Sequence, residues 1–547
     1  MTPSRMHPEP LGRLIERIAV ERERSGSILD IPVEEFFRPP FPSSRFSVLS
    51  DSCALPVGPA AGPHTHLAQS ILTGWLCGGR VFELKTVQIL DELEIEKPCI
   101  DAADEGYNTE WSSELRLDEA AEEYIKAWIL LHIVSSSEYG TPDHGALFTM
   151  SVGYDLEGVR SERVDRFIDT LAGRRNHSVF ERLREEARGA LVRTAGGVRA
   201  GVSTDVLDAI SPKICSSVAL STMHGCPPEE IEAIAVHLLE NKGLETVVKL
   251  NPTLLGLEEV RRILAENGYE YGLDADTFAE DLQYPRALSL IEHLRRRASD
   301  AGRHFGIKLS NTLPVANDRG SLPGETEYVS GKALLPITVS LAARLLSDVE
   351  EPLPVSYSAG ATAGNIGELL GCGLAPVTVS TELLKPGGYQ RLAAAARAAS
   401  EALSGTTPGA PSPGAETEGP RRRPPVELYP DPQRLSDLAT TLSGRYDVRK
   451  RRGTVTARIE ARLPVVDCFV APCVEACPLS QDVPAYIRAA ATGAPEEALH
   501  CILETNPFPS LTAALCDQRC AKACNRIEYE GSVQIRKVKG IAVRRAG

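Results

Sequence analysis

Short apolar runs alternate with amphipathic stretches along most of the chain. Eight runs have the length and β-branched content of strands, and most precede a stretch with helical period, such as residues 229–241. The eight predicted strands cover residues 54–62, 81–86, 147–154, 218–224, 246–252, 305–311, 353–360 and 376–381. Strand–helix alternation repeated eight times predicts an α/β fold, a (β/α)8 or TIM barrel. An open doubly wound sheet is the alternative.

Residues 405–426 are rich in proline, glycine and small polar residues, which offer little surface to bury. They predict a linker between a large N-terminal part and a small cysteine-rich part. In the latter, apolar residues at helical spacing follow Asp482, which predicts an N-capped helix. The expected domains are an N-terminal helical extension (1–50), a barrel (51–400) with an insertion (156–215), a linker (401–430) and a small, mainly α-helical domain (431–547).

Composition narrows the class of protein. The net charge of −15 argues against a nucleic-acid partner. The longest apolar run, 127–134, is too short to span a membrane, and the N-terminus lacks the layout of a signal peptide. Without an export signal, the thirteen cysteines are expected to be thiols and metal ligands rather than disulfides. The sequence therefore predicts a cytoplasmic protein.

Six cysteines near the C-terminus form two closely spaced groups. They are Cys468, Cys473 and Cys477, followed by Cys516, Cys520 and Cys524. Two groups of thiolates that folding brings together are typical of iron–sulfur ligation. Six are more than one four-ligand cluster needs and fewer than two clusters need. A single cluster with spare thiols is one alternative, and a zinc site is another, although zinc favours Cys-x2-Cys pairs that this segment lacks.

Polar and glycine-rich residues follow the predicted strands, where the chemistry of such barrels is located. Lys85 and Lys249 end strands inside the expected mouth, where an unpaired ammonium is costly to bury, so they predict a bound anion or salt bridges. Gly360 and the Ser380–Thr381 pair predict a phosphate site made by backbone N–H groups. Cys226 precedes a predicted helix, whose N-terminus is expected to lower the thiol pKa and suit it to proton transfer. A buried, inert thiol is the alternative.

These strand ends resemble the dihydroorotate and dihydropyrimidine dehydrogenase family of FMN barrels. The segments that carry the resemblance are Pro56-Val-Gly-Pro-Ala-Ala-Gly62, Lys85-Thr-Val-Gln88, Gly225-Cys-Pro227, Lys249-Leu-Asn-Pro252 and Asn311-Thr312. It implies that Cys226 is a catalytic acid/base and that Asn311 and Thr312 lie at the substrate. The residues that it assigns to FMN are Ala60, Ala61, Gly62, Lys85, Thr86, Lys249, Gly331, Gly360, Ser380 and Thr381.

One departure from that family concerns the substrate. Asp155 and Met223 stand where the pyrimidine dehydrogenases have asparagines that hold the base. A site that pairs hydrogen bonds with a ring discriminates strongly against a changed donor set. A pyrimidine substrate is therefore not expected.

The cysteine-rich part is similar to the iron–sulfur domain of dihydropyrimidine dehydrogenase and of the glutamate synthase small subunit, through its cysteines and through Asn506-Pro507. The similarity implies two [4Fe–4S] clusters, one on Cys468, Cys473 and Cys524 and the other on Cys477, Cys516 and Cys520. Each lacks a fourth ligand, because Val465 and Lys539 stand at those positions. The candidates for replacing it are Asp467, Glu528, Cys501 or a group from a partner.

The whole chain is similar to the selenate reductase-like family of iron–sulfur flavoproteins, through residues 57–65, 83–101, 220–227 and 467–477. That family usually adds an FAD/NAD(P)-binding pair, but no Gly-x-Gly-x-x-Gly fingerprint follows here. The prediction is an oxidoreductase that passes electrons between a small-molecule substrate at FMN and [4Fe–4S] clusters, and to or from an FAD/NAD(P)H-binding domain or subunit. The alternative is a catalytically silent electron-transfer or scaffold subunit of a larger redox complex, such as a molybdenum-dependent one.

Overall fold

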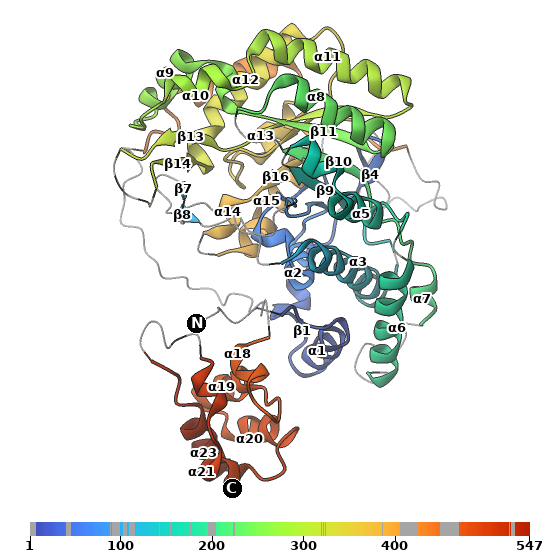
Figure 1. Ribbon diagram of the computed structural model, residues 1–547, viewed down its shortest axis with the longest axis vertical. Coiled ribbons are helices and arrows are strands. Elements are labelled where there is room, and N and C mark those ends of the chain that lie inside the picture. The colour runs from blue at the N-terminus through green and yellow to red at the C-terminus, as the bar shows by residue number, and fades with distance from the viewer. Residues whose placement is uncertain are drawn as a thin grey trace. The chain divides into compact units, whose positions relative to one another are not determined.

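The chain folds into two compact units, shown in Figure 1: Leu11–Val466, and Met1–Pro10 together with Asp467–Gly547. The structure is a computed structural model. The residues that it describes are 7–39, 45–87, 89, 99–101, 107–108, 115–141, 143–153, 155–175, 177–194, 204–221, 225–318, 320, 322, 324–385, 387–404, 424–448, 470–524, 526 and 531–546.

All eight predicted strands form, and they pair in sequence order as one parallel sheet. They are β5 (Val57–Pro59), β6 (Val81–Glu83), β9 (Leu147–Gly153), β10 (Cys215–Ser221), β11 (Glu245–Leu250), β12 (Phe305–Leu309), β15 (Val355–Tyr357) and β16 (Val377–Val379). The first and last strands of this sheet, β6 and β5, also meet, since the Arg80 amide donates to the Val57 carbonyl over 2.8 Å. A Cβ on Gly58 would lie 1.7 Å from the Val81 oxygen, so this approach requires glycine. The TIM barrel is confirmed.

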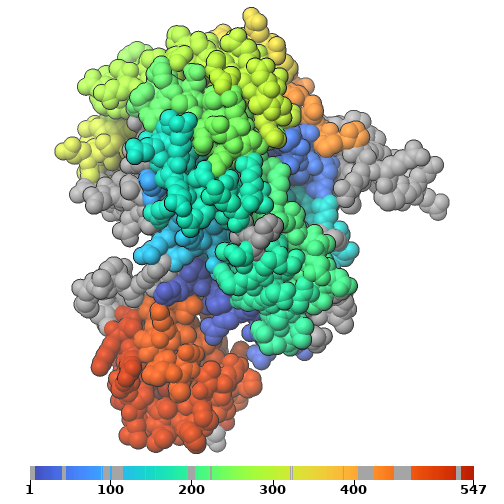
Figure 2. Space-filling view, turned by 45° about the vertical axis from the view of Figure 1, so that its right-hand side comes forward, coloured from blue at the N-terminus to red at the C-terminus, as the bar shows by residue number. Residues whose placement is uncertain are grey.

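Helices surround the strands, and Figure 2 shows part of the outer surface that they form. Those that follow the strands include α2 (Ala68–Leu76), α3 (Leu117–Tyr139), α8 (Pro228–Val236), α9 (Leu257–Glu266), α10 (Ala275–Glu280), α11 (Tyr284–Asp300), α12 (Leu334–Asp348), α13 (Ile366–Gly371), α14 (Thr381–Leu384) and α15 (Tyr389–Leu403). The insertion before β10 supplies α4 (Leu156–Arg160), α5 (Glu162–Leu171), α6 (His177–Arg193) and α7 (Asp205–Asp208). It packs on α3, and α6 also packs on the N-terminal helix α1 (Leu11–Arg24).

A buried ion pair crosses the barrel interior. Lys308 on β12 is paired with Glu83 on β6, and the Lys308 ammonium also donates to the Thr378 hydroxyl over 2.8 Å. All three side chains are almost fully buried. Burial lowers the Lys308 pKa, and the Glu83 carboxylate opposes that shift. The pair therefore satisfies two charges that would otherwise be costly inside the barrel.

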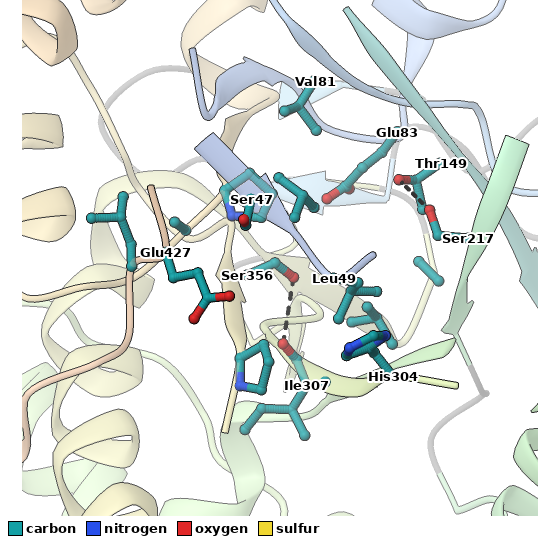
Figure 3. A pocket seen from close by; sticks show the side chains of 18 of the residues that line it. Ser47, Leu49, Val81, Glu83, Thr149, Ser217, His304, Ile307, Ser356 and Glu427 are labelled. Atoms are coloured by element: carbon teal, nitrogen blue, oxygen red, sulfur yellow. Dashed lines mark hydrogen bonds between the residues drawn. The ribbon is translucent and has the colours of Figure 1, made fainter. Parts of the chain in front are cut away.

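A cavity of about 90 Å³ lies at the amino-terminal end of the strands (Figure 3). Ser47 and Leu49 line it from the hairpin that β3 (Phe46–Val48) and β4 (Asp51–Cys53) form. On the barrel side, the hydroxyls of Thr149 and Ser217 are 3.0 Å apart. This end of a TIM barrel serves stability, and the chemistry is expected at the opposite end.

Three further strand arrangements were not predicted. A four-stranded sheet has the order β13 (Leu313–Ala316), β14 (Thr326–Val329), β7 (Ile100–Asp101) and β8 (Tyr107–Asn108). It continues directly from the end of β12, and β14 leads the chain to Gly331. The other two are the β3–β4 hairpin and the pairing of β1 (Ser27–Ile28) with β2 (Ile31–Pro32).

The smaller unit is mainly helical, as predicted. Its helices are α18 (Pro472–Glu475), α19 (Val483–Ala491), α20 (Pro495–Leu503), α21 (Pro509–Leu515), α22 (Arg519–Lys522) and α23 (Ile535–Ala546). Asp482 caps α19, as expected, because its carboxylate accepts from the Ala485 amide over 3.0 Å. Residues 7–10 also belong to this unit: the Val470 amide donates to the His7 carbonyl over 2.9 Å, and His7 Nε2 lies 3.3 Å from Glu475 Oε1.

The division between the units differs from the expected domain limits. Helix α16 (Pro432–Leu442) packs on α12 through the buried side chains of Leu435 and Leu438, so it belongs to the barrel unit. That unit runs to Val466 rather than ending before residue 431. Most of the predicted linker, residues 405–423, lies outside the described residues. None of the helices in the described ranges has the length and apolar character that a membrane crossing requires.

Candidate functional site

A chain of hydrogen bonds joins the carboxyl-terminal ends of three neighbouring strands. The Ser221 hydroxyl at the end of β10 donates to the side-chain oxygen Oδ1 of Asn311 over 3.2 Å, and the Asn311 side-chain amide donates to Oδ1 of Asn251 over 2.6 Å. The Asn251 amide in turn donates to the Asp281 carboxylate over 3.1 Å. Asn311, which the sequence places at the substrate, is therefore held in a fixed orientation at the barrel mouth.

Asp281 ends this network and also fixes the loop that carries Cys226. Its carboxylate accepts from the Thr253 hydroxyl over 2.7 Å and from the Gly225 amide over 2.8 Å. Gly225 has a φ of +75°, which favours glycine. Asp281 was not among the predicted site residues, because it lies directly after α10, between two helices, and no local pattern in the sequence marks it.

The expected pKa of Cys226 was wrong. The thiol is half-buried just before α8, but its sulfur lies 4.0 Å from the Glu230 carboxylate. Burial raises its pKa to about 11, and the charges of Glu230 and Asp155 add to the shift. These effects outweigh any pull from the helix N-terminus. At neutral pH the group is a protonated thiol, which can donate a proton.

The loop after β5 contains the three small residues assigned to the flavin. The Ala61 amide donates to the Glu83 carboxylate over 3.4 Å, and the Gly62 amide donates to the Thr65 hydroxyl over 3.1 Å. Ala60 precedes them at the strand end. The buried charge pair thus contacts the loop at the barrel mouth through Glu83.

Lys85 and Lys249 lie at the mouth, as the barrel prediction requires. Lys85 is buried, Thr86 beside it is half-buried, and the Lys85 carbonyl accepts from the Tyr124 hydroxyl over 3.2 Å. Lys249 is half-buried on β11, in register with Lys308 on β12. One lysine thus lies near the carboxyl-terminal end of β11 and the other just after β6.

Three loops meet in the place predicted for a phosphate. Gly331 and Gly360 have φ values of +77° and +66°, and a Cβ on Gly360 would lie 2.7 Å from the Gly331 oxygen. The Ser330 and Thr381 hydroxyls are 2.7 Å apart, and Ser380 immediately precedes α14. The residues that the resemblance assigned to the phosphate are therefore brought together.

The remaining predicted barrel residues are less informative. Thr312 is half-buried between Asn311 and β13. Met223, which lies between β10 and Cys226 in the sequence, is outside the described residues. Asp155 caps α4, since its carboxylate accepts from the Gly158 amide over 2.6 Å.

In the smaller unit, Cys520 has sulfur neighbours from both of the groups that the resemblance implied. Burial raises the pKa of Cys473 to about 11, and the nearby thiols of Cys520 and Cys524 add to the shift. Burial also raises the pKa of Cys520, and Cys477 and Cys516 are its other sulfur neighbours. Cys520 thus lies between the groups. Cys468 is outside the described residues.

The Tyr486 hydroxyl tests whether these residues fit a cluster. The side chain is 1% exposed, and its hydroxyl has no hydrogen-bond partner among the described residues. Burial raises its pKa, and the surrounding thiols of Cys520, Cys477, Cys473 and Cys516 add to the effect. A buried hydroxyl without a partner is unfavourable, and an iron–sulfur cluster offers sulfur acceptors. The residues therefore fit the group.

A single-ion site differs from a cluster in how its ligands are placed. A zinc ion requires four ligands around one centre, whereas each cysteine of a [4Fe–4S] cluster binds a different iron. Within the described ranges, no three His, Cys, Asp or Glu side chains are arranged to hold one metal ion.

The residues considered for the missing fourth ligands differ in what surrounds them. Cys501 lies with carboxylates instead of the other thiols: burial raises its pKa to about 12, with Asp482, Glu504 and Glu497 adding to the shift. Lys539 is buried, and its ammonium donates to the Gln481 side chain over 3.0 Å. Asp467, Glu528 and Val465 lie outside the described residues.

Comparison with known proteins gives two family matches. Residues 29–410 match the N-terminal TIM-barrel domain of oxidoreductase YgfK, and residues 447–546 match the 4Fe–4S cluster domain II of dihydropyrimidine dehydrogenase. The oxidoreductase YgfK of Escherichia coli K12 is 42% identical over 548 residues, which cover 98% of this chain and 51% of that protein. The chain therefore spans about half the length of that curated relative.

More distant similarities concern one part each. The β subunit of the NADPH–Fe(3+) oxidoreductase of Geobacter sulfurreducens is 35% identical over 74 residues, 14% of this chain and 11% of that subunit. A crystal structure of DHODH from Eimeria tenella, in complex with ferulenol, covers 74% of this chain and 93% of its own at 12% identity and a TM-score of 0.40. Because the first family match spans most of the chain, it belongs to the YgfK family of oxidoreductases, with a TIM barrel followed by a 4Fe–4S domain of the dihydropyrimidine dehydrogenase type.

Proposed function

We propose that the chain is an iron–sulfur flavoprotein oxidoreductase that moves electrons between a small-molecule substrate at FMN in the barrel mouth and [4Fe–4S] clusters. The observation that carries the proposal is the position of Cys226. A protonated thiol is held at the mouth by Asp281, in the same network that orients Asn311. An acid of this kind is useful where a hydride and a proton are added to one substrate.

The residues at the mouth support FMN as the cofactor. Lys85 and Lys249 would balance its negative charge, and Ala60, Ala61 and Gly62 leave room for a ring above β5. The loops of Gly331, Gly360, Ser380 and Thr381 would surround its phosphate. A bound flavin would supply hydride transfer, and the clusters would carry single electrons.

Cys226 and Asn311 act on the substrate in this proposal. Asn311 and Thr312 would hydrogen-bond the substrate and orient it. The S–H bond of Cys226 would break as its proton passes to the substrate, and solvent would return a proton to the thiolate afterwards. Because the raised pKa keeps the thiol protonated, the site is arranged for reduction of the substrate.

The cofactors can be counted on anaerobically purified protein. We expect flavin absorbance, acid-labile sulfide and about four or about eight irons per chain, for one or two clusters. A preparation with neither flavin nor sulfide would refute the proposal. Flavin without sulfide would support the flavin site in the barrel and refute the iron–sulfur clusters.

The role of Cys226 needs a separate experiment. Cys226→Ala is expected to lower turnover about 10²–10⁴-fold, because general acid catalysis contributes that much. Its flavin content should stay at the wild-type level. The control is Cys372→Ala, since Cys372 caps α13 away from the mouth and should leave turnover unchanged.

A second candidate function is an electron-transfer or scaffold subunit whose barrel no longer reacts with a small molecule. The observation in its favour is that Asp155 is occupied in capping α4, at a position where related barrels hold their substrate. Unchanged turnover in Cys226→Ala, measured with the physiological electron donor, would favour this candidate.

We further propose an FAD/NAD(P)H-binding partner or domain as the other end of the electron path. The support is the likeness of a short part of this chain to β subunits named for NADPH–Fe(3+) oxidoreductase and, in Moorella thermoacetica, for an NADP(+)-dependent formate dehydrogenase. We expect NADPH to reduce this chain only after a flavin-dependent NADPH reductase is added. Direct reduction by NADPH alone would contradict the proposal.

A further inference from the structure

Helix α23 presents two cations to the cysteine loops of the smaller unit. Arg536 donates to the Cys516 carbonyl over 3.1 Å, and Lys539 donates to Gln481 over 3.0 Å. Residues three apart lie on the same face of a helix, so one face of α23 carries both contacts. The exposed Lys537 lies between them on another face.

Gln481 holds the Lys539 ammonium in place. Gln481 is 1% exposed and follows Cys477 in a tight loop, where the Ser480 amide donates to the Cys477 carbonyl over 2.8 Å. The Gln481 amide donates to the Ile502 carbonyl over 3.3 Å, so its oxygen is left to accept from Lys539. The ammonium is thereby tied to the loop that carries one of the cluster cysteines.

No carboxylate balances this buried charge. Lys539 is 5% exposed, and among the described residues no Asp or Glu oxygen lies within ion-pair distance of its ammonium. Its charge acts on Cys520, which shares its surroundings with Cys477 and Cys516. A buried ammonium without an anion is unfavourable, so the site requires a negative group that the described residues do not provide.

We propose that Lys539 is a fixed cation for the cluster bound by Cys477, Cys516 and Cys520, and that its charge makes this cluster easier to reduce. The inference rests on the proposed function, because it requires that cluster. Adding one electron to a cluster makes the site more negative, and a nearby positive charge stabilises the reduced form most strongly where water is excluded. Lys539 acts through its charge and through its position beside Gln481, and it is not a ligand.

The test is a potentiometric titration of the full chain, purified with its clusters and followed by electron paramagnetic resonance. Lys539→Met removes the charge and the hydrogen bond, whereas Lys539→Gln removes the charge and keeps a donor for Gln481. Lys537→Met is the matched control, because it removes an exposed charge from the same helix. Iron and acid-labile sulfide are measured on every sample.

We expect Lys539→Met and Lys539→Gln to keep the wild-type iron and sulfide content and to shift the potential of one cluster to a more negative value. Lys537→Met should match the wild type. Equal potentials in all four proteins would overturn the inference, as would a shift in Lys539→Met that Lys539→Gln does not show. Loss of about half of the iron from both Lys539 variants would show instead that Lys539 is needed to build the cluster. Absence of sulfide from the wild type would overturn the proposed function itself.

Discussion

The Asp281 carboxylate accepts a hydrogen bond from the Gly225 amide over 2.8 Å, which ties the loop of Cys226 to the ends of β11 and β12. The carboxylate is buried and also accepts from Asn251 and Thr253. One side chain therefore positions both the proposed proton donor and the proposed substrate-binding asparagine.

Asp281→Ala should weaken the barrel and its chemistry together. It leaves several buried donors without an acceptor, and each such loss costs about 1–3 kcal/mol, so we expect a decrease of at least about 2 kcal/mol in the free energy of unfolding. All three tryptophans precede residue 130, so tryptophan fluorescence during denaturation reports on the barrel unit. Asp274→Ala, which removes the exposed N-cap of α10, should cost about 1 kcal/mol and leave turnover unchanged. Equal effects of the two variants would contradict the role of Asp281.

The Cys226 thiol should react slowly at neutral pH. Thiolate is the reactive form, and a pKa of about 11 means that the alkylation rate at Cys226 should rise about tenfold per pH unit beyond pH 9. Because folding raises the pKa of the Cys226 thiol, this thiol also contributes to the stability of the fold. The contribution is fully present below about pH 8.5 and is lost as the pH rises towards the pKa of the thiol in the folded protein. Mass spectrometry of the alkylated peptides measures the rate at this residue. A plateau below pH 9 would show that the pKa is not raised.

Lys308→Met should destabilise the barrel more than the loss of one ordinary hydrogen bond. It leaves the buried Glu83 carboxylate without its cation, and breaking such a pair costs about 3–5 kcal/mol. The double variant Lys308→Met with Glu83→Gln should recover part of this loss, because no unpaired charge remains. Denaturation curves of the two single variants and the double variant give the coupling free energy between Lys308 and Glu83. Additive effects would mean that the pair contributes little.

Gly360→Ala should remove flavin from the barrel. The new Cβ would lie 2.7 Å from the Gly331 oxygen, so the two loops would have to separate. Gly302→Ala is a matched control, because Gly302 has a similar φ of +63° but nothing within 4 Å of an added Cβ. The control should lose about 1 kcal/mol of stability and keep its flavin. Flavin retention in both variants, measured by absorbance after gel filtration, would argue against a phosphate site there.

Cys501→Ser should keep its iron. The groups around Cys501 are carboxylates, whereas Cys520 lies between both groups of thiols. Cys520→Ser should therefore lose at least one cluster, or about four irons per chain, while Cys501→Ser matches the wild type. Iron and sulfide analysis of the two variants decides this. Equal iron loss would make Cys501 a ligand after all.

The eight strands could be predicted because each is a short apolar run followed by its own helix. Sheet β13-β14-β7-β8 could not, because its pairing of β7 with β14 joins segments that lie far apart in the chain. Asp281 has no local signal either, since only the folded barrel brings it to Gly225. The upward shift of the Cys226 pKa could be predicted in part, because Glu230, four residues later, lies in the first turn of the following helix.

The contact between His7 and the segment around Val470 and Glu475 links the two ends of the described chain within the smaller unit. During synthesis, residue 7 leaves the ribosome before any of the barrel, and the cysteine loops leave it after the barrel. The smaller unit can therefore be completed only after the whole barrel has been made. A bulky tag placed before His7 should disturb cluster assembly before it disturbs the barrel.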